Sequence, residues 1–272
     1  MFSSMAHVLV LWGAAAAAVA GMEFRYHSLE EVNSYVHHVA SEHASLVTLQ
    51  YLGNTVKVVL TADVIFEASE SFVVGDLSLV VRARRENTNG VSINRNFPGA
   101  FERVSPINRP PVEPETAALM RLLRAYPAVL TVLVFGGLRG VLYPYDDLPG
   151  IGAAFSRISG SLADYAYAYE GSLPLSVYIG CCKYDESRSL RGHFEHSKAP
   201  LLRLLRLADR GVRGTVTNRR GEPVAGALLA ISNRTVGFRT NQFGEFWRML
   251  LPGFYMLLVM DTKRSCLRVL IP

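Results

Sequence analysis

The rest of the chain is organised around one stretch, Val91-Ser92-Ile93-Asn94-Arg95-Asn96-Phe97-Pro98-Gly99-Ala100-Phe101. Its β-branched residues predict a strand, and its Pro-Gly pair predicts a turn just after two asparagines and an arginine. At such a junction Asn94 and Arg95 can present planar donors to one carboxylate, because the arginine fork binds both carboxylate oxygens. The alternative is a loop in which the Asn side chains cap their own backbone and Arg95 is solvated.

The composition indicates a globular protein. The chain has 272 residues, enough for one large domain or for a large and a small one. Hydrophobic residues make up 50% of the chain and charged residues 19%, which excludes an intrinsically disordered protein. The net charge of +5 is modest, and the arginines are scattered without a basic-aromatic stripe. We therefore expect no nucleic-acid partner.

Residues 1–20 have the pattern of a signal peptide. An apolar, Ala-rich run from Val8 to Ala20 ends in Ala18-Val19-Ala20, the small-x-small form of a cleavage site. No later segment has the uninterrupted run of about eighteen apolar residues that a membrane span needs. The C-terminal residues lack the pattern of a glycolipid-anchor signal. Together these features predict a secreted, extracellular protein without a membrane span.

The three cysteines define no disulfide framework. Cys181 and Cys182 are adjacent, and adjacent cysteines rarely pair with each other because of the geometry of the bridge. One of them could pair with Cys266, which leaves an odd thiol. Cys-x-x-Cys spacing is missing from the sequence, so a zinc site built from cysteines is not predicted.

Helix and strand patterns alternate between residues 21 and 209. Ser28-Leu29-Glu30-Glu31 has the spacing of a capping box and begins a helix predicted over 28–43. Further helices are predicted over 114–126, 158–169 and 198–209, and strands over 46–52, 56–60, 65–74, 77–81, 128–135 and 175–179. The alternation predicts an α/β domain over 21–209, with a mixed, mostly parallel sheet flanked by helices.

After Arg210 the pattern changes to a period of two residues. Strands are predicted over 212–217, 227–232, 236–240, 245–250, 254–260 and 267–271, with turn signals between them. This spacing predicts a small antiparallel β-sandwich domain over 210–272. Asn233-Arg234-Thr235 is a glycosylation sequon in a predicted turn, so Asn233 is a predicted glycosylation site.

Several motifs in one order resemble a known family. The chain resembles the zinc metallocarboxypeptidases of the N/E subgroup in the segments Phe24–His27, Asn87–Gly90, Asn94–Pro98, Glu113–Thr116, Gly136-Gly137, Tyr143–Asp146 and Gly180–Tyr184. The tail from Gly211 to Gly253 resembles the transthyretin-like domain that follows the catalytic domain in that subgroup. The resemblance implies a metallocarboxypeptidase-like fold followed by a transthyretin-like sandwich.

The resemblance also implies an activity, the zinc-dependent removal of C-terminal Arg or Lys from peptides. In the family, a His-x-x-Glu pair and a later His hold the zinc, and a Glu acts as the general base. The counterparts of Asn94 and Arg95 bind the terminal carboxylate of the substrate. Zinc is thus the cofactor expected for the family, and peptide or protein C-termini, basic ones included, are the expected partners.

This sequence departs from the family pattern at the residues that carry the chemistry. The interval that should contain His-x-x-Glu, before Asn94, has no histidine and is shortened. Phe135 occupies the later ligand position before the Gly-Gly pair, and Tyr178 occupies the general-base position. A second segment, with the substrate-facing Tyr of the family, is missing between Tyr169 and Leu175. A truncated, catalytically inactive copy without zinc is therefore expected.

Other candidate ligands are weaker. His27-Ser28-Leu29-Glu30 has the letters of the ligand pair, but Ser28 is the better helix cap, which puts His27 outside the helix. His193 and His196 are expected on a solvated turn, and His37 and His38 point to different faces of their helix. Glu67 and Glu70 are expected at a solvated strand edge or loop.

The leading hypothesis is a secreted metallocarboxypeptidase-like protein that lacks hydrolytic activity and keeps the binding of peptide C-termini through Asn94 and Arg95. One alternative is an active basic carboxypeptidase with relocated zinc ligands. Another is a shortened isoform or faulty gene model of an active basic metallocarboxypeptidase. Phe135 and Tyr178 oppose the last alternative, because skipped exons alone do not change residues inside otherwise matching strands.

Overall fold

The computed structural model describes residues 24–26, 29–42, 66–68, 71–75, 87, 89–99, 111–125, 128–144, 160–182, 185–208, 210–260 and 266–271. The predicted signal peptide over 1–20 and the predicted strands over 46–52, 56–60 and 77–81 lie outside these residues. The first described helix, α2 (Leu29–Glu42), agrees with the helix predicted over 28–43.

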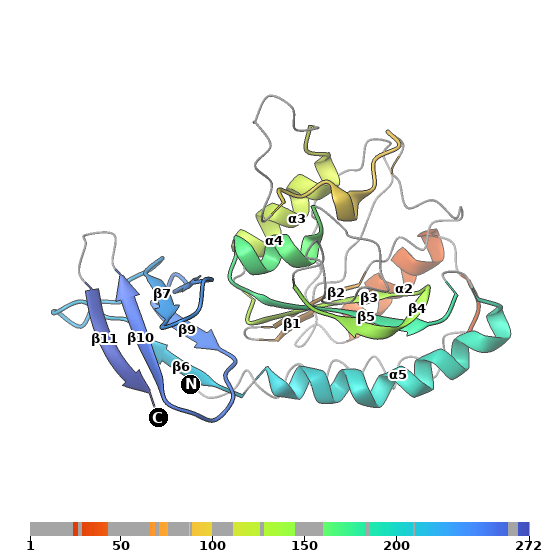
Figure 1. Cartoon of the computed structure of the whole chain (residues 1–272). Helices are drawn as coiled ribbons and strands as arrows, with labels where there is room; N and C mark the ends of the chain where they lie inside the picture. The colour runs from red at the N-terminus through yellow and green to blue at the C-terminus, as the bar shows by residue number, and fades with distance from the viewer. Residues whose placement is uncertain are drawn as a thin grey trace.

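A five-stranded sheet forms the centre of the α/β part (Figure 1). Its strands are β1 (Phe66–Ala68), β2 (Ser71–Gly75), β3 (Leu130–Phe135), β5 (Leu173–Gly180) and β4 (Leu138–Leu142), in the order β1-β2-β3-β5-β4. The central pairs β2–β3 and β3–β5 are parallel, whereas β1–β2 and β4–β5 are antiparallel. The predicted mixed sheet is confirmed. It is not mostly parallel among the described strands, because both outer pairs are antiparallel.

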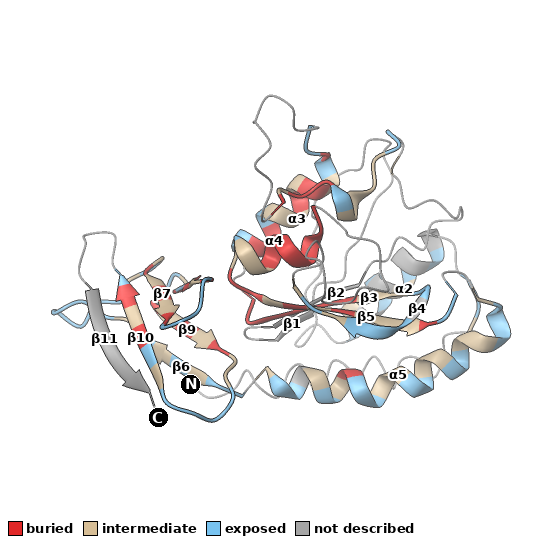
Figure 2. Cartoon of the chain, viewed as in Figure 1, coloured by how far each residue is buried: buried red, intermediate tan, exposed pale blue. Residues whose placement is uncertain are grey.

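Strand β3 shows why helices lie on both faces of this sheet. Leu130 and Val132 pack with Leu201 of helix α5 (Ser187–Leu207). Leu133, which points to the opposite face, packs with residues of α3 (Pro114–Ala125) and α4 (Leu162–Ala168). Because successive side chains of a strand alternate between faces, one apolar strand serves both layers. Figure 1 shows α3 and α4 on one side of the sheet and α5 on the other, and Figure 2 shows the buried centre between them.

Three predictions in this region need correction, and one strand was not expected. The strand predicted over 65–74 is two strands, β1 and β2, that pair antiparallel. Strand β4 was not predicted, because it is short and lies at the exposed edge of the sheet. Residues 93–95 form a 3-10 turn, η2 (Ile93–Arg95), and not the end of a strand. Helix α5 begins at Ser187, well before the predicted start at residue 198.

The C-terminal part consists of two antiparallel sheets. One contains β11 (Cys266–Ile271), β10 (Tyr255–Met260), β7 (Leu228–Ile231) and β8 (Phe238–Arg239), and the other pairs β6 (Val212–Thr215) with β9 (Glu245–Arg248). Phe246 of β9 shares one buried cluster with Leu229 and Leu257 of the larger sheet. All six predicted strands are present, and described side chains from both sheets share this core. Likeness to transthyretin stays a prediction.

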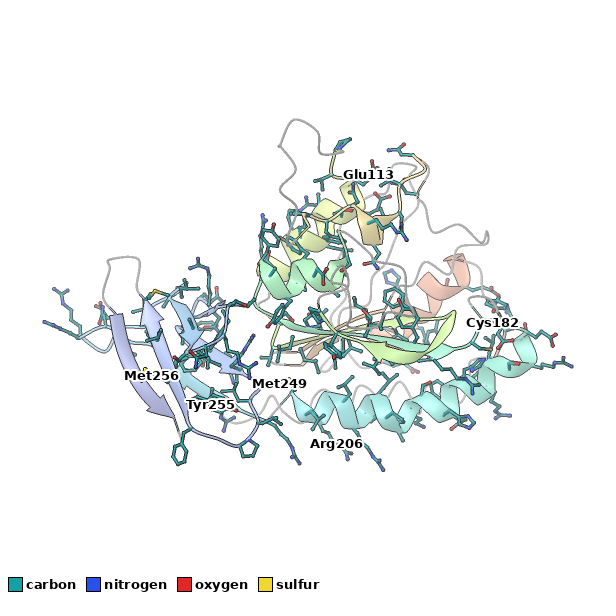
Figure 3. All side chains as sticks on the ribbon, viewed as in Figure 1. Glu113, Cys182, Arg206, Met249, Tyr255 and Met256 are labelled. Carbon is teal, nitrogen blue, oxygen red and sulfur yellow. The ribbon has the colours of Figure 1, made fainter. Side chains whose placement is uncertain are left out.

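Arg248 connects this core to the α/β part. The residue is 7% exposed. Its guanidinium lies 5.2 Å from the Phe238 ring centroid and donates a hydrogen bond to the carbonyl oxygen of Gly171. Burial lowers the pKa of Arg248. The next residue, Met249, packs against the apolar cluster under α5 (Figure 3). The two parts therefore share both a hydrogen bond and an apolar contact.

Leu130 tests the layer under α5. Its side chain is 1% exposed, so Leu130→Ala leaves a cavity and we expect it to lower the free energy of unfolding by about 2–5 kcal/mol. Val141, which is 54% exposed on β4, provides the control, and Val141→Ala should change stability by less than about 1 kcal/mol. Urea denaturation of the full chain measures both values. Equal losses in the two variants would contradict the described layer.

Candidate functional site

Asn94 ties the central motif to helix α4. Its side-chain oxygen Oδ1 accepts a hydrogen bond of 2.9 Å from the backbone N–H of Leu162, at the start of α4. The Ser161 hydroxyl accepts another, 3.0 Å from the N–H of Asp164. Two of the N–H groups that a helix leaves without partners in its first turn are thus satisfied. Asn94 is held in place by the fold, with its oxygen already engaged.

The other asparagines of the motif region bind Glu113 and its neighbours. Asn87 and Asn89 each donate a 2.8 Å hydrogen bond from Nδ2 to Oε2 of the buried Glu113. Asn96 accepts a 2.8 Å bond from the Glu113 N–H and donates to the Pro111 carbonyl at 3.0 Å. Figure 3 labels Glu113 at the start of α3. These amides fix the loop, as the alternative interpretation of the sequence predicted for an Asn-rich turn.

Arg95 differs from its neighbours. Its side chain is exposed, and it has no hydrogen bond or ion pair with another described residue. Its backbone is fixed, because its N–H donates to the carbonyl of Ser92 at 3.0 Å. A guanidinium on a fixed backbone can bind a carboxylate through two parallel hydrogen bonds. Arg95 is therefore the residue of the motif with free binding capacity in the described part of the chain.

Phe135 and Tyr178 lie side by side on the two central strands. Residue 135 of β3 pairs with residue 178 of β5, and the two rings stack with centroids 5.2 Å apart. By the resemblance, position 135 corresponds to a zinc-binding His of the family and position 178 to its general base. A phenyl ring offers no lone pair to a metal, and a phenol replaces the carboxylate. The side chains at these two positions do not fit zinc.

The two halves of the site lie on one apolar cluster. Ile93, next to Asn94, packs against the cluster of Phe97, Leu133 and Leu162, and Phe135 packs against the same cluster. Tyr165 of α4 extends it by stacking on Tyr169, with centroids 5.1 Å apart. Burial raises the pKa of Tyr165, whose hydroxyl donates to Glu170. The motif and Phe135 thus pack on the same buried cluster.

The remaining histidines give mixed outcomes. His193 and His196 lie inside α5, so the solvated turn predicted for them is wrong. His193 is 15% exposed and its Nε2 lies 2.7 Å from Oδ2 of Asp185, whereas His196 contacts the Gly192 carbonyl. His37 and His38 are exposed on α2. Glu67 lies on edge strand β1, and His27 and Glu70 are outside the described residues.

A cluster that the sequence patterns did not indicate lies between β5 and α5. The Sγ atoms of Cys181 and Cys182 are 3.3 Å apart, and a carboxylate oxygen of Asp185 lies with them in a group whose ligand atoms are all within 4.8 Å of one another. His193 and the N–H of Glu186 lower the pKa of Asp185, and Cys181 raises that of Cys182. Spacing alone did not reveal this group, because its proximity is seen only in the three-dimensional positions of the side chains.

Residues 76–150 match the zinc carboxypeptidase family. Over 219 residues the chain is 29% identical to carboxypeptidase D of Drosophila melanogaster, and over 223 residues it is 27% identical to mouse carboxypeptidase M. The matches cover 63% and 64% of this chain. The chain is therefore similar to the zinc carboxypeptidases, both over the part that the family model matches and over most of its length.

The chain spans only part of the length of these relatives. The chain spans 16% of the length of the Drosophila protein and 49% of the mouse protein. Its fold resembles a chain in the structure of bovine thrombin-activatable fibrinolysis inhibitor in complex with tick carboxypeptidase inhibitor. That match has a TM-score of 0.53 and 10% identity, over 66% of this chain and 96% of that chain. The fold is therefore carboxypeptidase-like.

Gly160 tests how closely the motif is held. It has φ +72, and a Cβ placed on it would lie 2.7 Å from the Arg95 carbonyl oxygen and 2.8 Å from that of Phe97. We expect Gly160→Ala to destabilise the protein by about 1–3 kcal/mol more than Gly90→Ala. Gly90 is a matched control because its φ is +75 with no atom within 4 Å of such a Cβ. Urea denaturation of the two full-length variants measures the difference; equal values would show that the clash is absent.

Proposed function

We propose that this protein is a secreted, non-hydrolytic carboxypeptidase relative that binds the C-terminal carboxylate of peptides through Arg95, with Asn94 beside it. The observation that carries the proposal is the exposed Arg95 guanidinium, which has no partner among the described residues and stands on a fixed backbone. The neighbouring amides are occupied by the fold, so their presence needs no ligand to explain it. Arg95 has no such structural role in the described contacts.

The absence of hydrolysis follows from the chemistry of peptide cleavage. The reaction needs a metal to polarise the carbonyl group and a base to take a proton from water. Phe135 and Tyr178 fill two of the positions concerned with stacked rings. The stacked rings are an argument that these positions bind no zinc and supply no carboxylate base. Binding without cleavage is the function that these residues still support.

The resemblance to carboxypeptidase M suggests peptides that end in Arg or Lys as the first ligands to test. The leader pattern of residues 1–20 supports an extracellular location. Asn233 lies exposed in the turn after β7, which is compatible with glycosylation of its sequon. The helices in the described part of the chain are all too short or too polar to cross a bilayer.

A second candidate is a shortened form of an active basic carboxypeptidase. The two segments that are missing relative to the family pattern, before Asn94 and between Tyr169 and Leu175, favour it, because the residues that flank them match that pattern. The aromatic pair opposes it, because Phe135 and Tyr178 sit in register on paired strands within a matching region. Sequencing the transcript separates the two candidates: a longer transcript with His and Glu at these positions would support the active enzyme.

Arg95→Gln tests the carboxylate grip. For a peptide that ends in a free-acid arginine, we expect at least about tenfold weaker binding, because two charge-assisted hydrogen bonds are lost. Arg95→Lys keeps the positive charge but cannot form two parallel hydrogen bonds to a carboxylate. Its affinity for the peptide should therefore lie between those of Arg95→Gln and the native protein. Calorimetric titration of the full chain gives the dissociation constants.

Two controls sharpen this test. Arg219→Gln removes an equally exposed arginine from a turn of the C-terminal part and should leave binding unchanged. The C-terminally amidated peptide should bind the native protein as weakly as the acid peptide binds Arg95→Gln. Equal affinity of acid and amide peptides for the native protein would overturn the proposed function.

Hydrolysis is measured separately. Mass spectrometry of the same peptide, incubated with the full chain and added Zn²⁺, should show no release of the terminal arginine. The physical reason is that Phe135 and Tyr178 supply no ligand and no carboxylate base at their positions. Release of arginine at the rate of an active carboxypeptidase would support the second candidate.

A further inference from the structure

We propose that Cys181, Cys182 and Asp185 form a binding site for one thiophilic divalent cation of the zinc type. Two thiols and a carboxylate offer three ligand atoms that all lie within 4.8 Å of one another. Both cysteines are exposed and unpaired, so an ion has access to the sulfur atoms from solvent. Figure 3 places Cys182 beside the beginning of α5.

The distances fit a tetrahedral ion after a small adjustment. Zinc–sulfur bonds of about 2.3 Å at a tetrahedral angle separate two sulfur ligands by about 3.8 Å. The sulfur atoms of Cys181 and Cys182 are 3.3 Å apart. Side-chain rotations that move the two sulfur atoms apart by a fraction of an ångström therefore give the separation that the ion requires. Three protein ligands leave a fourth position for water or another small ligand.

The carboxylate of Asp185 is already oriented. Its Oδ2 lies 2.7 Å from Nε2 of His193, and its Oδ1 accepts a 2.8 Å hydrogen bond from the N–H of Glu186. The hydroxyl of Tyr26 donates to the carbonyl of Asp185 at 2.6 Å and fixes the backbone from the other side. Hydrogen bonds of this kind orient the ligands of metal sites in proteins. Here they come from α5 and from the N-terminal segment.

His193 also lies beside the end of β5. Its ring is 3.4 Å from the position that a Cβ would take on Gly180, the last residue of β5, which is an ordinary van der Waals distance. Gly180 immediately precedes the cysteine pair. The histidine that contacts Asp185 therefore lies next to the strand end from which the cysteines follow.

A disulfide between the two cysteines competes poorly with metal binding. Consecutive Cα atoms are about 3.8 Å apart across a trans peptide, whereas bridged cysteines prefer about 4.4–6.8 Å. The pair therefore tends to stay as two thiols when Cys266 is not linked to either. Thiolate ligands select soft or borderline cations such as Zn²⁺ and Cd²⁺ over Mg²⁺ and Ca²⁺.

Cadmium provides the direct experiment, because its bonds to thiolates absorb in the ultraviolet. Titration of the reduced full chain with Cd²⁺ should produce this charge-transfer band and saturate at one ion per chain. Zn²⁺ should displace the ion and abolish the band, and Mg²⁺ should not. Cys181→Ser and Cys182→Ser should each lose most of the band. Asp185→Asn should bind Cd²⁺ about tenfold more weakly than the native chain does.

The third cysteine is the matched control. Cys266→Ser removes a thiol from β11 and should leave the band and its stoichiometry unchanged. Circular dichroism verifies that each variant is folded, and Asp185→Asn can keep the hydrogen bonds to His193 and Glu186. Absence of the band in the native chain, or equal binding by Cys182→Ser, would overturn the proposal. So would loss of the band in Cys266→Ser alone.

The double variant Cys181→Ser/Cys182→Ser separates this proposal from the proposed function. Zinc that disappears in the double variant belongs to the cysteine cluster and leaves the non-hydrolytic function intact. Zinc that the double variant retains at one ion per chain belongs elsewhere and overturns the cysteine site. Retained zinc together with arginine release would overturn the proposed function as well.

Discussion

The structure depends on the parallel pairing of β3 with β5. This pairing places Leu130 opposite Leu173 and Phe135 opposite Tyr178, and it leaves β3 buried between two layers of helices. Strands joined in this way end at the same edge of the sheet, so the residues at their carboxyl ends meet there. The aromatic stack lies at that edge, and the cysteine pair follows directly after β5. One register therefore positions both candidate sites.

The Asn-rich motif shows how a functional motif can persist for structural reasons. Asn94 accepts from the first turn of α4, and Asn96 connects to the start of α3 through Glu113. Loss of either amide would leave buried or helix-terminal backbone groups without a partner, which costs about 1–3 kcal/mol for each group. The two asparagines can thus be retained because the stability of the fold requires them. Only Arg95, exposed and without a described partner, points to binding in its own right.

The long and strongly patterned elements were predictable from the sequence. The apolar run that forms β3, the Pro-initiated helix α3 and the six alternating strands after Arg210 all occur where periodicity indicates them. Short edge strands such as β4 were not, since five residues at an exposed edge carry little pattern. The early start of α5 was missed because residues 187–197 are polar and His-rich, and their helix is stabilised by packing and by His193.

The candidate sites divide in the same way. The substitutions at 135 and 178 could be identified by comparison with a family pattern, because each stands beside a recognisable motif. Their stacking could not, because it follows from the register of two strands that are far apart in sequence. The approach of Asp185 to the cysteine pair is likewise a feature of the three-dimensional structure. The local sequence shows which chemical group a residue carries, whereas the residue that it contacts is known only from the tertiary structure.

The aromatic stack has a structural role that does not depend on any activity. The rings of Phe135 and Tyr178 join the carboxyl ends of β3 and β5, and Phe135 packs on the cluster that contains Phe97 and contacts Ile93. Ring contacts of this kind stabilise by about 0.5–1.5 kcal/mol beyond the area they bury. In the proposed non-hydrolytic protein, these contacts take the place of a metal and its ligands in holding the strand ends together. The pair then also contributes to the packing beneath the motif that carries Arg95.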